Sequence, residues 1–281
     1  MLLRVLRESV PGLKGRWPES QAPEEWRGVT MENGRVVKLR LTNMGLGGAV
    51  PAVIGQLTAL KQLDLIGNWL TSLPAETGQL ASLTRLDLDS NQLTSLPAEI
   101  GQLTSLTTLH LRGNQLTSVP AEVWQLASLR VLNLGANQLT SVPAEIGQLT
   151  LLEWLDLGVN QLTSLPAEIG QLTSLTGLGL RGNKLTTLPA EIWQLTSLRE
   201  FYLYGNQLTS VPTEIGQLTS LRSLNLGQNQ LTSVPAEIGQ LTSLVRLSLK
   251  GTQLTTLPAR IRELRAAGCE VHMGAGVTFE E

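Results

Sequence analysis

The side chains that could carry out catalysis or bind a metal are few in this chain and far apart in its sequence. His110 and His272 are the two histidines and Cys269 is the single cysteine among 281 residues. We interpret Cys269 and His272 as structural residues near the chain end, because no third ligand is nearby. A metal or catalytic pair is the alternative. No phosphate-binding glycine loop, HExxH or CxxC pattern occurs. The sequence predicts no enzyme, no catalytic residue, no cofactor and no metal site.

The aspartates offer one further possibility. Asp64, Asp87 and Asp156 occupy equivalent places in the repeated pattern described below, so each is expected on a separate strand. Asp64 and Asp87 would lie on neighbouring strands, about 5 Å apart. A carboxylate pair or a weak cation site there is a minor alternative.

One pattern of eleven residues runs through most of the chain. It reads Leu-x-x-Leu-x-Leu-x-x-Asn-x-Leu, as in "LTRLDLDSNQL" starting at Leu83. Its asparagines recur every 23 residues, at Asn68, Asn91, Asn114, Asn137, Asn160, Asn183, Asn206 and Asn229. Two degenerate copies carry Thr252 and Met44 at the asparagine position, so the chain contains ten units.

These residues resemble the repeats of the leucine-rich repeat family. The segment "LPAEIGQL" is similar to the short intracellular type, which has a 23-residue repeat. The segment "EEWRGVTMENGRVVKLRLTNMGLGG" resembles the N-terminal cap of plant-type members, without the cysteine pair that such caps carry. The resemblance implies a protein-recognition module, in a signalling or host-interaction pathway.

The repeat also predicts the fold on physical grounds. In "LDLDSN" the leucines alternate inward along a short strand, and stacked units form a parallel sheet of about ten strands. Inward carboxamides can satisfy backbone groups where the strand turns away, so Asn137→Ala is expected to cost roughly 1–3 kcal/mol. Pro166 and its equivalents begin a short helical turn on the outer side. We therefore expect an α/β solenoid, a horseshoe with the sheet on its concave face and the helical turns on its convex face.

Three parts of the chain are expected. Residues 1–35 form an N-terminal cap, in which a helix and the side chains of Trp17 and Trp26 cover the first strands. Residues 36–258 form the solenoid. Residues 259–281 form a C-terminal cap, with an amphipathic helix in "ARIRELRAAGC" followed by short strands in "EVHM" and "VTF".

The outward strand positions vary from unit to unit, so a binding site is expected on the concave face. Gly177 and Gly179 remove two side chains from one strand and predict a hollow roughly 10 Å wide between the neighbouring strands. The flanking positions are rich in aromatic and charged residues, which are Trp154, Asp156, Arg181, Glu200, Tyr202 and Tyr204. These eight residues form the predicted partner-binding site. Drift among duplicated units is the alternative.

A secondary patch of charged residues is predicted on the strands of two earlier units. Its members are Arg85, Asp87, Asp89, His110 and Arg112, and charge pairing across the strands would explain them. Trp124 and Trp193 replace the glycine of "EIGQL" on the outer side. We interpret these two as variation in surface packing, with a second contact surface as the alternative.

Composition bears on the class of partner and on location. The net charge is −2 and no basic run occurs, so neither nucleic acid nor a membrane surface is expected as a partner. The single cysteine and the absence of a secretory segment predict a soluble, cytoplasmic protein. We expect a monomeric, non-enzymatic module that binds a protein or peptide. The alternative function is a structural or self-associating scaffold element without a dedicated ligand.

Overall fold

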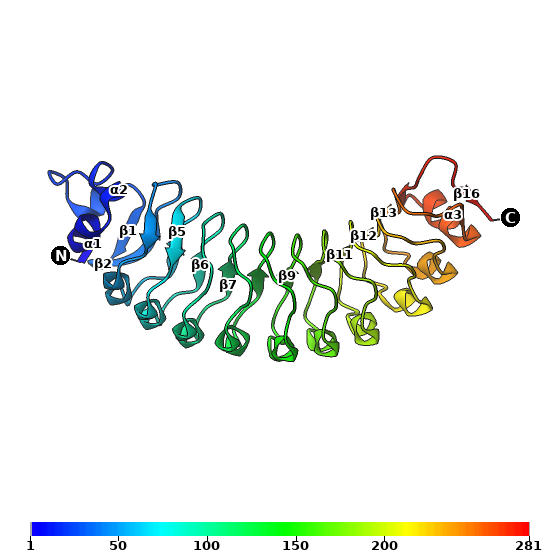
Figure 1. Cartoon of the computed structure of the whole chain (residues 1–281), viewed down its shortest axis with the longest axis horizontal. Coiled ribbons are helices and arrows are strands. Elements are labelled where there is room, and N and C mark those ends of the chain that lie inside the picture. Colours follow the sequence, from blue (N-terminus) through cyan, green and yellow to red (C-terminus); the bar gives the residue numbers. More distant parts are fainter. Residues whose placement is uncertain (1, 281) are drawn as a thin grey trace. The chain divides into compact units, whose positions relative to one another are not determined.

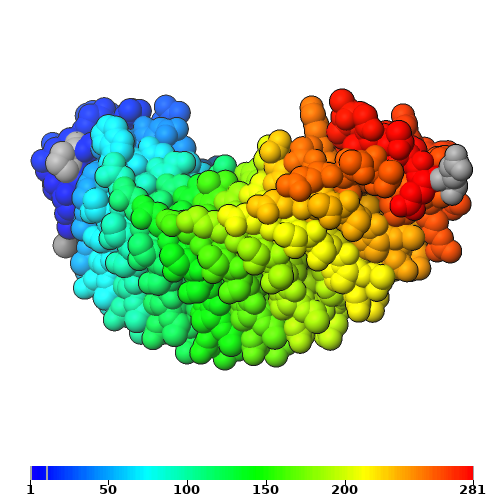
Figure 2. Space-filling model, turned by 45° about the vertical axis from the view of Figure 1, so that its right-hand side comes forward, coloured from blue at the N-terminus to red at the C-terminus, as the bar shows by residue number. Residues whose placement is uncertain are grey.

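The computed structural model describes residues 2–280, and the chain divides into two compact units, residues 1–138 and 139–281. Each unit is a stack of repeats with strands on one side and short helical turns on the other (Figure 1). The side of each unit that carries the strands is called its strand face below, and the opposite side its turn face. In the space-filling view, the repeats of a unit follow one another as adjacent bands (Figure 2).

The first unit opens with a cap of short helices and a hairpin. The elements of the cap are α1 (Leu2–Ser9), α2 (Pro11–Lys14), η1 (Pro23–Glu25) and β1 (Val29–Glu32), which pairs antiparallel with β2 (Arg35–Arg40). The rings of Trp17 and Trp26 are buried and stacked, with centroids 4.8 Å apart. Their indole nitrogens donate to the carbonyls of Arg27 and Pro18. The predicted helix and the burial of both tryptophans are confirmed.

The repeats of the first unit add parallel strands in register. The main sheet continues from β2 through β4 (Gln62–Asp64), β6 (Arg85–Asp87), β7 (Thr108–His110) and β8 (Val131–Asn133). A two-stranded sheet joins β3 (Gly47–Ala49) and β5 (Trp69–Ser72). The outer turns are 3-10 helices, namely η2 (Ala52–Gln56), η3 (Ala75–Gln79), η4 (Ala98–Gln102) and η5 (Ala121–Gln125).

The second unit has the same architecture. Its parallel strands are β9 (Trp154–Asp156), β10 (Gly177–Gly179), β11 (Glu200–Tyr202), β12 (Ser223–Asn225), β13 (Arg246–Ser248) and β15 (Glu270–His272). Its turns are η6 (Ala144–Gln148), η7 (Ala167–Gln171), η8 (Ala190–Gln194), η9 (Thr213–Gln217) and η10 (Ala236–Gln240). Helix α3 (Ala259–Ala266) packs against η10, and β14 (Thr256–Leu257) pairs with β16 (Thr278–Phe279). The helix and the short strands predicted at the end are confirmed.

Leucines and asparagines hold the repeats together. The inward leucines of the strands, such as Leu86 and Leu88, are fully buried. The side chain of Asn91 donates to the carbonyls of Leu65 and Leu88, both at 3.0 Å, and accepts from the amide of Leu70 at 3.1 Å. The predicted role of the asparagine column is confirmed, because each carboxamide satisfies backbone groups of its own repeat and of the preceding one.

Two details of the turns differ from the sequence prediction. Pro166 lies one residue before η7 with φ −72° and ψ 152°, so it caps the turn and does not form its first residue. Trp124 and Trp193 are buried, with 2% and 4% of their surface exposed, so the prediction that they vary on the surface is wrong. The ring of Trp193 meets Phe201 edge-on at 6.5 Å, because Phe201 replaces the middle leucine of its strand and extends the apolar interior.

The predicted solenoid fold is confirmed in both units, with the parallel sheet on the strand face and the helical turns opposite it. The proposed division at residues 35 and 258 stays a prediction. None of the helices within residues 2–280 has the length and apolar character that a membrane crossing requires.

Candidate functional site

The strand face of the second unit brings the predicted partner-binding residues together. Trp154, Gly177 and Glu200 are paired across β9, β10 and β11. The next outward positions pair in the same way, and they are Asp156, Gly179 and Tyr202. Arg181 and Tyr204 lie two residues beyond the ends of β10 and β11. Side chains from three successive repeats, which are 23 residues apart in sequence, therefore form one surface.

The predicted hollow at the two glycines does not exist as an empty space. An added Cβ on Gly177 would lie 2.2 Å from the ring of Trp154, and one on Gly179 would lie 2.6 Å from the carboxylate of Asp156. Both glycines are themselves buried. The missing side chains thus let Trp154 and Asp156 lie across the next strand. The surface is filled by the neighbouring side chains, and Trp154 presents part of its ring to solvent.

Two more glycines accommodate large neighbours in the same way. An added Cβ on Gly158 would lie 2.9 Å from Cγ of Arg181, and one on Gly227 would lie 3.3 Å from Cδ2 of Tyr204. The stem of Arg181 and an edge of the Tyr204 ring therefore lie close to the backbone of these glycines. Tyr204 keeps 45% of its surface exposed.

Tyr202 is fixed by a hydrogen bond within its own strand. Its hydroxyl donates to Oε2 of Glu200 at 2.5 Å. Burial, together with the hydrogen bond and the charge of Glu200, raises the pKa of the Tyr202 phenol above its ordinary value. The hydroxyl therefore stays protonated at neutral pH and orients Glu200 on the surface.

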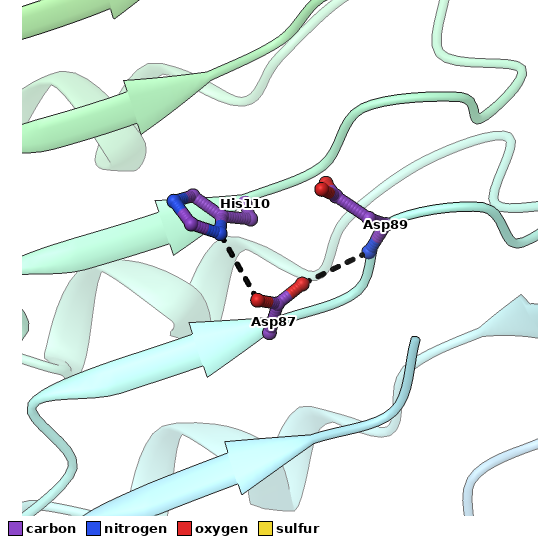
Figure 3. Close-up of side chains that lie close together, drawn as sticks. All are labelled: Asp87, Asp89 and His110. Atoms are coloured by element: carbon purple, nitrogen blue, oxygen red, sulfur yellow. Dashed lines mark hydrogen bonds and ion pairs between the residues drawn. The ribbon is translucent and has the colours of Figure 1, made fainter. Parts of the chain in front are cut away.

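The secondary patch of the first unit is more tightly connected than the sequence predicted. Nδ1 of His110 lies 3.0 Å from Oδ2 of Asp87 (Figure 3). Nη2 of Arg85 lies 2.8 Å from the same oxygen. The amide of Arg112 donates to Oδ1 of Asp89 at 2.6 Å. The side-chain contact across the strands joins His110 to Asp87, whereas the ion pair of Arg85 with Asp87 lies within β6. Pairing of opposite charges across the strands stays a prediction.

The two aspartates of this patch have opposite pKa shifts. Burial opposes ionisation of Asp87, but His110, the amide of Asp89 and Arg85 outweigh it and hold the pKa of Asp87 below its usual value. Burial is also the largest influence on Asp89. The amide of Arg112 offsets it in part, and the nearby charge of Asp87 reinforces it, so the pKa of Asp89 is raised. Asp87 is therefore the carboxylate that stays ionised most readily.

The carboxylate pair that the sequence suggested is not a joint site in the structure. Asp64 and Asp87 are in register, but Oδ1 of Asp64 accepts hydrogen bonds from Thr42 and from the amide of Ile66. They form no joint site, because each carboxylate is bonded to other groups.

Cys269 is buried, which raises the pKa of its thiol, whereas His272 is exposed and faces Glu270 at 3.8 Å. Their different environments support the structural interpretation of both residues.

The sequence analysis missed a cleft at the N-terminal cap. Its volume is about 600 Å³, and it lies between α1, the β1–β2 turn and η2. Leu3, Met31, Val36 and Leu57 contribute apolar walls. None of the predicted site residues lines this cleft, and the repeat pattern gives no signal for it because the cap lies outside the repeats.

Family models of leucine-rich repeats match the chain in several segments. A model described as a leucine-rich repeat region matches residues 85–158 and 120–226. Two further leucine-rich repeat models match residues 35–93 and 219–262. Together these matches extend from the first parallel strand of the first unit to α3.

Two curated plant proteins are similar to short parts of the chain. A probable inactive receptor kinase of Arabidopsis thaliana is 41% identical over 71 residues, which is 25% of this chain and 11% of that protein. A probable leucine-rich repeat receptor-like protein kinase of the same organism is 40% identical over 68 residues, or 24% and 7%. The chain thus matches only a small part of the length of these relatives.

Solved structures are similar over most of the chain. A leucine-rich repeat protein of Leptospira interrogans superposes with a TM-score of 0.81 and 46% identity, over 86% of this chain and 61% of that one. The Arabidopsis receptor kinase HAESA, in a complex with a peptide hormone and a co-receptor, gives a TM-score of 0.80 and 28% identity. That match covers 91% of this chain and 46% of the receptor.

Proposed function

The chain belongs to the leucine-rich repeat family, and on this basis we propose that it is a non-enzymatic module that binds a protein or peptide. The contact surface is the strand face of the second unit, around Trp154, Tyr202 and Tyr204. The similar receptor HAESA has been solved with a peptide hormone and a co-receptor, which supports a polypeptide as the class of partner.

The observation that carries this proposal is the arrangement of the aromatic rings on the strand face. Trp154 lies over Gly177, and Tyr204 lies over Gly227. Rings packed against a sheet lose little conformational entropy on binding, because they are already restricted in the free protein. Partly exposed Trp and Tyr with this restriction are typical of the residues that dominate binding energy in protein interfaces.

Charged groups beside the rings supply the means of selecting a partner. Arg181 is exposed at one side, and Glu200 is oriented by the hydroxyl of Tyr202. Asp156 accepts from the amide of Gly158 at 2.8 Å, which fixes its carboxylate next to Gly179. A partner that presents an apolar group between an acidic and a basic residue would match this surface in charge as well as in shape.

The experiment is affinity capture of binding partners from the source cell on the immobilised full chain. A partner identified in this way is titrated against wild type and against the double variant Trp154→Ala/Tyr202→Ala. We expect the double variant to weaken binding at least about tenfold, or about 1.4 kcal/mol. Trp69→Ala is the matched control, because Trp69 is 61% exposed and lies in the other unit. Equal affinity of the wild type and the double variant would remove this surface from consideration.

The alternative function, a self-associating scaffold element, makes a different prediction. We propose a monomer, whose light-scattering mass does not change with concentration. Oligomers that form with rising concentration would favour the scaffold. A role in signalling or host interaction and a cytoplasmic location are further parts of the proposal. They rest on the family resemblance and on the single free thiol, Cys269.

A further inference from the structure

Three metal-ligating side chains converge on the strand face of the first unit. Asp87 ends β6, Asp89 follows it by two residues, and His110 ends β7 on the adjacent strand (Figure 3). One ligand atom from each side chain lies within 4.8 Å of the other two. The neighbouring strands are paired in register, so the sheet itself holds Asp87 beside His110.

The donor atoms suit a particular class of ion. An imidazole nitrogen with two carboxylate oxygens is a ligand set for Zn²⁺ and related divalent transition metals, whereas Ca²⁺ and Mg²⁺ prefer oxygen alone. Tetrahedral bonds of about 2.1 Å place ligand atoms about 3.4 Å apart. His110 and Asp87 are already 3.0 Å apart. Small side-chain rotations would therefore bring all three donors to the required separation.

The two carboxylates are oriented by backbone groups. Oδ1 of Asp87 faces the amide of Asp89 at 3.4 Å, and Oδ1 of Asp89 accepts from the amide of Arg112. The second oxygen of Asp87 is thereby left to contact His110, and a carboxylate oxygen of Asp89 lies within 4.8 Å of both other ligand atoms. Asp87 has 1% of its surface exposed, so its charge is poorly screened by water.

A cationic group already lies against two of the donors. Nη2 of Arg85 is 2.8 Å from Oδ2 of Asp87 and 3.3 Å from Nδ1 of His110. The side chain of Arg85 keeps 44% of its surface exposed, whereas its partner Asp87 is buried, so Asp87 needs a cation beside it. Arg85 can therefore turn toward solvent when another cation takes its place beside Asp87, and both donors are then available to that cation.

We propose that Asp87, Asp89 and His110 bind one divalent transition-metal ion of the Zn²⁺ class, and that Arg85 is the cation that the metal displaces. Three protein ligands leave one tetrahedral position open toward solvent. A water molecule or a donor group of a bound polypeptide can fill that position. The sequence analysis predicted no metal site, so this proposal departs from it.

The test is titration of the untagged full chain with ZnCl₂ by calorimetry, and with CoCl₂ by visible absorption. We expect one ion per chain and the absorption bands of tetrahedral Co²⁺, with no competition from millimolar Ca²⁺ or Mg²⁺. His110→Asn and Asp89→Asn should each weaken binding at least about tenfold. Arg85→Gln should strengthen it several-fold, because the competing cation is removed.

The controls separate this site from incidental binding. Asn133 and Asn225 occupy the position of His110 in other repeats, so His110→Asn is compatible with the fold, and circular dichroism checks this. His272→Asn removes the other histidine and should leave the affinity unchanged. Lack of saturable Zn²⁺ binding would overturn the proposal. Equal loss in His272→Asn and His110→Asn, or weaker binding in Arg85→Gln, would also overturn it.

Discussion

Replacing Asn137 by alanine tests what holds neighbouring repeats together. The carboxamide of Asn137 donates to the carbonyls of Leu111 at 2.9 Å, Leu134 at 3.0 Å and Gly135 at 3.2 Å, and accepts from the amide of Leu116 at 3.1 Å. The residue is 8% exposed, so water does not readily replace these bonds.

The bonds lost in Asn137→Ala set the magnitude of the effect. The buried amide of Leu116 loses its acceptor, which costs about 1–3 kcal/mol. The carbonyl of Leu111 keeps a bond from Asn114, so its loss is nearer the net value of one hydrogen bond, about 0.5–1.5 kcal/mol. A similar loss applies at the carbonyl of Leu134. The expected decrease in the free energy of unfolding is therefore about 2–6 kcal/mol.

The assay is equilibrium unfolding in urea followed by circular dichroism, with two matched variants. Asn133→Ala makes the same change on the strand face, where the side chain accepts a hydrogen bond from the amide of Gly135 at 3.0 Å. It should cost about 1 kcal/mol. The loss of unfolding free energy in Asn137→Thr should lie between the losses in the two alanine variants. The reason is that Thr252, in the same column, donates a hydrogen bond to the carbonyl of Leu249 in its own repeat. If Asn137→Ala is no less stable than Asn133→Ala, the hydrogen-bond explanation of the asparagine column is wrong.

Three further predictions concern backbone strain, the aromatic surface and the thiol. Val159→Gly should raise the free energy of unfolding by about 1 kcal/mol in the same urea assay, because Val159 has φ +56° where Gly182 and Gly205 occupy the equivalent positions; an unchanged midpoint would contradict this. Gly177→Ala should shift the tryptophan fluorescence, because its Cβ would meet the ring of Trp154, and the shift should vanish in a Trp154→Phe background. Cys269 should react with Ellman's reagent at least about tenfold more slowly in the folded chain than in urea, because burial raises the pKa of its thiol and restricts access; equal rates would show that it is exposed.

Much of the fold could be predicted from the sequence because the same pattern of leucines and asparagines recurs along the chain. Leucines that alternate along each strand fix which side chains face inward, since successive residues of a strand point to opposite faces. The 23-residue period then places equivalent residues side by side, so the asparagine column and the outward positions of Trp154 and Tyr202 followed directly. The predicted strand, turn and terminal elements depended only on such local patterns.

Contacts between the variable side chains of different repeats could not be predicted in this way. The period places Trp154 next to Gly177, but only the packed structure shows that the ring covers the glycine and fills the expected hollow. Trp193 of η8 likewise turns inward toward Phe201 of β11. Its orientation depends on the space that a residue of another repeat leaves to it.

The sequence by itself determined the repeat, its parallel strands and the face on which each residue lies. Only the tertiary structure decided that Asp87 is buried between Arg85 and His110, and that Asp89 lies close enough to join them. The physical reason is that register sets the positions of backbones, whereas the direction of a side chain depends on the space and charge that its neighbours in other repeats leave to it.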